Sequence, residues 1–169
     1  MKKTSYKLAA CGVLSALACI TFVIENLFPP LFIPGAKLGL SNLFILLALA
    51  TLGARYAFFA LGVKTLVGCF VTGFYSLAYS LPAGIAALAA EIILIYYVKT
   101  SLPAASAAGA VINVTVQNLV FCITAGAAEY FVYLPYLALI GAVTGSAVGL
   151  ALHFAVRKLP ENLFKENAN

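Results

Sequence analysis

Long apolar runs dominate the chain, and short stretches that hold most of the charges, glycines and prolines separate them. A helix of about 20 apolar residues is long enough to cross the hydrocarbon core of a bilayer. Six candidate spans follow, near residues 8–28, 38–52, 56–75, 82–98, 103–125 and 133–156, the second of them short. Four prolines, expected at boundaries or in first helical turns, support these limits: Pro30, Pro82, Pro103 and Pro135. The pattern predicts an all-α, polytopic membrane protein, a six-helix bundle in which residues 1–169 form one integral membrane domain.

Composition supports a membrane protein over a soluble one. Hydrophobic residues make up 64% of the chain and charged residues only 9%, and the mean hydropathy is +1.07. A soluble domain of 169 residues would need far more polar surface to face water. The net charge of +5 comes from scattered bases, so we expect no nucleic-acid partner.

The basic residues predict the orientation, because cytoplasmic loops of membrane proteins are enriched in lysine and arginine. With an even number of spans, both termini share one side with Lys2, Lys3, Lys7, Arg55, Lys99, Arg157, Lys158 and Lys165. The opposite side receives Lys37 and Glu129. We therefore predict that both termini are cytoplasmic.

Lys37 lies on the predicted outer side, against this rule, where the second span begins. Its side chain could extend to lipid headgroups, or it could supply a cation at the mouth of an outward-facing pocket. Glu25, in the outer third of the first span, lies at the same depth and could pair with it.

Two further ionisable residues, Lys64 and Glu91, lie inside predicted spans. A charge at the bilayer centre costs about 2.5–3.5 kcal/mol on insertion scales, so such residues are candidates for function. Lys64 lies nine residues after Arg55 at the inner boundary, and Glu91 lies nine residues after Pro82 at the outer boundary. We expect an ion pair near the midplane, either a structural contact between helices or the floor of a ligand pocket.

The fifth span carries the amides Asn113, Gln117 and Asn118. Asn113 and Gln117 are four residues apart and share a helical face. Amides in membrane helices often only hold helices together, but two on one face near Lys64 and Glu91 favour a polar pocket.

Small residues form two stripes that would let helices approach closely. Gly12, Ser15 and Ala16 lie in the first span, and Gly141, Gly145 and Gly149 lie in the sixth. Packing within the bundle and docking of a partner explain the sixth-span stripe equally well.

Several kinds of chemistry are missing from the sequence. It contains no aspartate, so it lacks the aspartate-rich magnesium site that diphosphate chemistry uses, and it has no glycine-rich loop for ATP. The four cysteines form no C-x-x-C pair, and His153 has no metal-binding partner in the sequence. We expect neither a metal nor a cofactor, and no catalytic residue.

Four segments in order resemble one family over nearly the whole chain: PGAKLGLSN (34–42), GVKTLVG (62–68), GAVINVTVQNL (109–119) and YLPYLALIGAVTGSAVG (133–149). They resemble the Gx transporter family, also known as heptaprenyl diphosphate synthase component I, which is similar to the substrate-binding S components of energy-coupling factor (ECF) transporters. An arginine is more usual in that family at Lys64, and a histidine at Asn113.

The resemblance implies an S-component-like bundle in the bacterial cytoplasmic membrane that binds a small organic molecule: a vitamin, a cofactor precursor or an isoprenoid-like compound. Lys37, Glu25, Asn26 and Asn42 would lie near the pocket mouth, and Lys64, Glu91, Asn113 and Gln117 would form its interior, with Asn118 nearby. Gly12, Ser15 and Ala16 would dock on a transmembrane coupling subunit driven by two ATPases.

Two alternatives stay open. The chain could be a non-catalytic membrane component of a heptaprenyl diphosphate synthase. It could also be a structural membrane protein whose buried charges only stabilise the bundle.

Overall fold

The computed structural model describes residues 2–27, 39–126 and 128–158, and these form helices joined by short connections. There are six α-helices in this part of the chain: α1 (Lys2–Leu27), α2 (Leu40–Leu52), α3 (Ala54–Thr72), α4 (Tyr75–Ile92), α5 (Leu102–Ala125) and α6 (Leu134–Lys158). A π-helical turn, η1 (Ile93–Tyr97), continues α4, and a 3-10 helix, η2 (Ala128–Tyr133), precedes α6.

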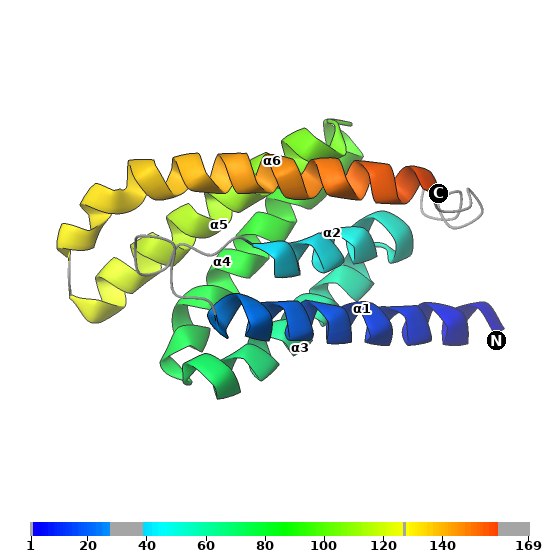
Figure 1. The fold of residues 1–169 in the computed structure, drawn as a ribbon, viewed down its shortest axis with the longest axis horizontal. Coiled ribbons are helices and arrows are strands. Elements are labelled where there is room, and N and C mark those ends of the chain that lie inside the picture. The colour runs from blue at the N-terminus through cyan, green and yellow to red at the C-terminus, as the bar shows by residue number, and fades with distance from the viewer. Residues whose placement is uncertain (1, 28–38, 127, 159–169) are drawn as a thin grey trace.

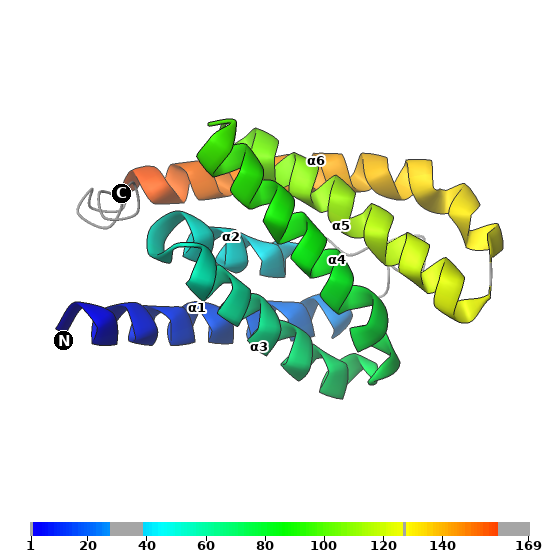
Figure 2. The ribbon, with the colours of Figure 1, turned by 180° about the vertical axis from the view of Figure 1, so that it is seen from behind.

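The helices form two groups of three. Helices α1, α2 and α3 pack against one another, and α5 packs against both α4 and α6. Contacts of α3 with α4 and of α2 with α6 join the two groups. Figures 1 and 2 show α4 running obliquely between the α1–α3 group and the α5–α6 pair. We call α1–α3 the N-terminal half and α4–α6 the C-terminal half.

Five of the described helical segments are long and apolar enough to cross a membrane, which makes the chain a multi-pass membrane protein. They are Ser5–Leu27, Ala54–Thr72, Tyr75–Tyr97, Leu102–Ala125 and Ala128–Lys158. Helix α2 is apolar but has only 13 residues, so it extends about 20 Å, less than the hydrocarbon thickness of about 30 Å. The structure therefore supports five full spans and a shorter sixth helix, rather than six full spans.

The fourth helix differs from the sequence-based expectation. It begins at Tyr75, seven residues before the proline that the sequence analysis placed at its start, and Pro82 lies inside it. Gly73, with a positive φ of 92°, ends α3 and turns the chain instead. An internal proline removes one backbone hydrogen bond, and membrane helices tolerate it where other groups satisfy the freed carbonyl.

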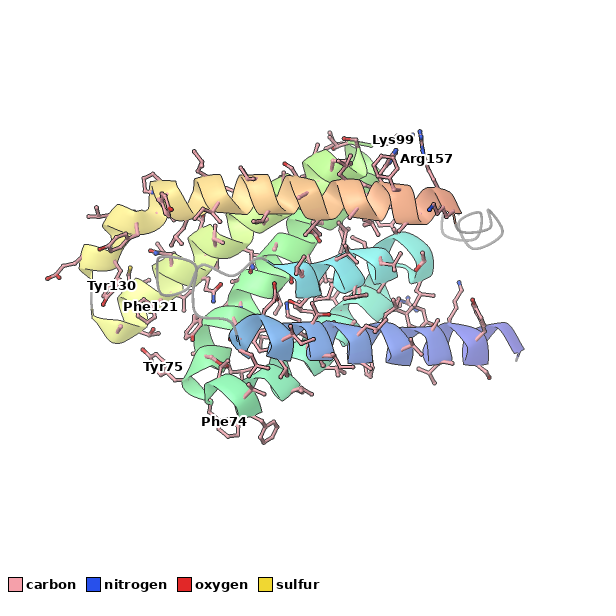
Figure 3. All side chains as sticks on the ribbon, viewed as in Figure 1. Phe74, Tyr75, Lys99, Phe121, Tyr130 and Arg157 are labelled. Atoms are coloured by element: carbon pink, nitrogen blue, oxygen red, sulfur yellow. The ribbon has the colours of Figure 1, made fainter. Side chains whose placement is uncertain are left out.

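The start of α1 and the end of α6 lie at the same end of the bundle (Figure 1). Lys99, in the connection between η1 and α5, and Arg157 lie near that end, whereas Phe74, Tyr75 and Tyr130 lie near the other (Figure 3). Bases at one end of a helical membrane bundle follow the enrichment of lysine and arginine on one side of the membrane. This arrangement agrees with both termini lying on the same side of the membrane. That this side is the cytoplasmic one stays a prediction.

The glycine stripe of the sixth span packs inside the bundle. A Cβ atom at Gly145 would lie 2.6 Å from Ala110 Cβ, and one at Gly149 would lie 2.6 Å from Pro103 Cα. Gly141 faces α5 in the same way. The stripe therefore lets the backbones of α5 and α6 come together, which decides between the two interpretations that its sequence left open.

Candidate functional site

A small polar cavity lies where the two halves meet. Its polar lining comes from four helices: Asn42 on α2, Glu91 on α4, Ser106 and Asn113 on α5, and Thr144 on α6. Its other walls are small or apolar, namely Gly39, Ala110, Val114, Gly141, Gly145 and Val148. The cavity volume is about 30 Å³, which is room for about two water-sized groups.

Glu91 is the charged residue of this lining. Its side chain is 8% exposed, and it lies directly against the backbone of Gly109 on α5, where a Cβ atom would collide with the carboxylate. Gly109 therefore leaves the space that the Glu91 side chain fills. The α-helix changes to the π-helical η1 immediately after Ile92, and such π turns occur frequently at functional sites.

Lys64 belongs to a network within the N-terminal half. It is 8% exposed, and its Nζ donates a 2.6 Å hydrogen bond to Asn42 Oδ1. The same ammonium lies 5.7 Å from the centroid of the Phe22 ring, within the range of a cation–π interaction. Lys64 thus connects α3 to α1 and α2.

Lys64 on α3 and Glu91 on α4 lie on opposite sides of the junction between the halves. Both residues reach the interior on neighbouring helices, as the sequence suggested. The direct hydrogen bond described for Lys64 goes to Asn42, however, and Asn42 in turn lines the cavity beside Glu91. Asn42 is therefore the residue through which the lysine reaches the cavity wall.

Gly39 sets the position of Asn42. It adopts the left-handed conformation, with φ 71° and ψ 18°, just before the first residue of α2. Its carbonyl accepts a 2.9 Å hydrogen bond from the backbone N–H of Asn42. A glycine adopts this conformation without the steric cost of a Cβ atom. The turn starts α2 with Asn42 in its first turn, facing the cavity.

Glu25 and Asn26 make local contacts outside the cavity lining. Glu25 Oε1 accepts a 2.7 Å hydrogen bond from the backbone amide of Leu40, the first residue of α2. Asn26 donates through Nδ2 to the carbonyl of Phe22, one turn earlier in α1. Glu25 therefore serves as an N-terminal cap of α2, where a negative charge also complements the helix dipole.

We expect Glu25→Gln to destabilise the protein by about 0.5–1 kcal/mol, because the amide carries no negative charge at the N-terminus of α2. The free energy of unfolding, measured by titration with denaturing detergent, checks this. Glu129→Gln is the control, since Glu129 is exposed in η2. Equal stability of the two variants would contradict the capping role.

The amides of α5 separate into two groups. Asn113 lines the cavity, whereas Gln117 lies one turn farther along, half-buried and outside the described lining. Asn118 donates a 3.3 Å hydrogen bond to the carbonyl of Tyr130 and accepts one from the Cys122 thiol. Asn118 thus connects α5 to η2, a structural contact rather than a cavity contact.

The predicted docking residues of α1 do not share one surface. Gly12 and Ala16 are exposed, and a Cβ atom at Gly12 would meet nothing within 4 Å. Ser15 is 3% exposed, and its hydroxyl bonds the carbonyl of Cys11. Ser15 therefore packs inward and is not available to a partner. Lys37, the predicted cation at the pocket mouth, lies outside the described residues.

Sequence reasoning missed Ser106 and Thr144. Ser106 lies seven residues before Asn113, so two helical turns place both on one face of α5. Thr144 lies between Gly141 and Gly145 in the stripe that faces α5. The spacing could have identified Ser106, but the position of Thr144 depends on how α6 packs.

A cavity of this kind can bind a small polar group. Its carboxyl group, amides and hydroxyls can make several hydrogen bonds at once. Within the described residues no group of three or more histidine, cysteine or acidic side chains could hold a metal ion.

Comparison with known proteins identifies the family. The family model described as heptaprenyl diphosphate synthase component I matches residues 14–155, a range that includes every residue of the cavity lining. No curated protein and no solved structure matches the chain. The chain belongs to the heptaprenyl diphosphate synthase component I family.

Proposed function

We propose that the chain is the substrate-binding membrane subunit of an ECF-like transporter, and that the cavity between its halves holds part of a small organic molecule. The observation that carries this proposal is the convergence of five polar side chains from four helices on one cavity. Polar and ionisable residues in membrane helices are costly, and they commonly mark the path of a substrate or an ion.

The size of the cavity bears on how such a molecule would bind. Pockets that enclose a drug-sized ligand measure about 300–1,000 Å³, whereas this one measures about 30 Å³. A vitamin-sized molecule could place only a head group here unless the halves move apart. The boundary between the halves, where α2 meets α6 and α3 meets α4, is where such movement would occur.

The family name favours a second candidate, a non-catalytic membrane component of a heptaprenyl diphosphate synthase. A catalytic role is difficult to support, because the sequence has no aspartate for a diphosphate-bound magnesium ion. An accessory role, in which the chain brings a soluble synthase to its lipid product, remains compatible with the fold.

Gentle purification from the native membrane distinguishes the two candidates. The transport proposal expects the chain to be isolated with a transmembrane coupling subunit and two ATPases, and to support ATP-dependent uptake after reconstitution. Isolation with a soluble prenyl diphosphate synthase, whose activity rises when the chain is added, would overturn the transport proposal in favour of the accessory role.

A further inference from the structure

The cavity wall carries one acidic side chain, Glu91. Glu91 contributes a carboxylate that is more than nine-tenths buried, and among the described residues no hydrogen bond to it is formed. An ionised carboxylate buried without hydrogen bonds is costly. A ligand that supplies positive charge or hydrogen-bond donors would offset that cost.

The neighbouring groups also offer oxygen atoms. The Thr144 hydroxyl donates to the carbonyl of Ile140 at 2.9 Å, so it presents lone pairs to the cavity. Ser106 and Asn113 can each accept a hydrogen bond or coordinate a cation through oxygen. These three side chains and Glu91 come from three helices of the C-terminal half.

The cation of the N-terminal half is already engaged. Lys64 donates to Asn42 Oδ1 and lies over the Phe22 ring, and it is not among the residues of the cavity lining. Lys64 therefore reaches the cavity through Asn42, whose amide group lines it. The carboxyl group of Glu91 is therefore the ionisable group of the cavity lining.

We propose that this cavity binds a small cation, either a monovalent metal ion or the ammonium group of an organic substrate, with Glu91 as its counter-ion. Oxygen atoms of Ser106, Asn113 and Thr144 complete the site. The volume of about 30 Å³ suits a bare ion or an –NH₃⁺ group and excludes a bulky quaternary ammonium. The proposal rests on the proposed binding function and specifies the charge of what is bound.

Heat stability of the purified protein in detergent tests the proposal, because a ligand that binds only the folded state raises the melting temperature. Sodium chloride, potassium chloride and methylammonium chloride are compared with tetramethylammonium chloride at equal ionic strength. Tetramethylammonium has the same charge but no N–H donor and too large a volume. At tenfold excess over the dissociation constant, we expect a rise of about 3–6 °C.

The rise should disappear in Glu91→Gln and persist in Glu129→Gln, which removes an exposed acid. A rise with sodium or potassium indicates an ion site, and a rise only with methylammonium indicates a substrate amine. Lys64→Leu, which removes the competing charge, should enlarge the rise wherever the variant stays monodisperse.

Equal melting temperatures in all four chlorides, or an equal rise in Glu91→Gln, would overturn the cation proposal. The binding function fails separately. If the cations have no effect but an organic molecule is retained in a Glu91-dependent manner, the cavity is a binding site for another class of ligand. If Glu91 affects the retention of no molecule, the binding function is wrong as well.

Discussion

Gly149→Ala is expected to destabilise the protein by about 1–3 kcal/mol, the usual cost of overpacking a close-packed interior. A Cβ atom at Gly149 would lie 2.6 Å from Pro103 Cα and 2.9 Å from the carbonyl oxygen of Leu102. Both are backbone atoms, which cannot rotate away as a flexible side chain can. Helices α5 and α6 would have to separate near the end of the bundle that holds both termini. Unfolding in denaturing detergent measures the change.

Gly12→Ala is the matched control. It is also a helical glycine in a stripe of small residues, but a Cβ atom there meets nothing within 4 Å. Because alanine favours helix over glycine, this variant should be unchanged or slightly more stable. If both variants lost the same stability, close packing of Gly149 against α5 could not be the cause of its loss.

Lys64→Leu is expected to destabilise the protein by about 2–3 kcal/mol, because it removes a charged hydrogen bond from a buried acceptor. The substitution leaves Asn42 Oδ1 without its 2.6 Å hydrogen bond, and it removes the positive charge on the helix next to the one that carries Glu91. The free energy of unfolding measures the loss.

The double variant Lys64→Leu with Glu91→Leu separates structure from function. It removes both charges, so it should recover part of the stability that Lys64→Leu loses. If the double variant were as unstable as Lys64→Leu alone, the coupling between the two charges would be refuted. If it kept full ligand binding and transport, these residues would only stabilise the bundle, and the structural alternative would hold.

Much of the fold could be predicted from the apolar runs, because a bilayer requires long, internally hydrogen-bonded helices. The error at α4 shows the limit of that approach. Pro82 suggested a helix start, since proline favours first turns. The chain turns instead at Gly73, where α3 ends, and Pro82 lies inside α4. Local preference could not show that a membrane helix continues through the proline.

The site was partly predictable for a related reason. Lys64, Glu91 and Asn113 were identifiable because polar groups in an apolar run are costly, whatever their neighbours. Their partners depend on packing. Three contacts join residues on different helices: the hydrogen bond from Lys64 to Asn42, the capping of α2 by Glu25 and the contact of Glu91 with Gly109. No spacing within one helix encodes them.

Native mass spectrometry of the protein, released from detergent after gentle purification, tests the central claim most directly. We expect one small molecule or ion bound per chain in the wild type and in Glu129→Gln, and its loss in Glu91→Gln. A bound mass retained equally in Glu91→Gln would contradict the claim that the cavity between the two halves is the binding site.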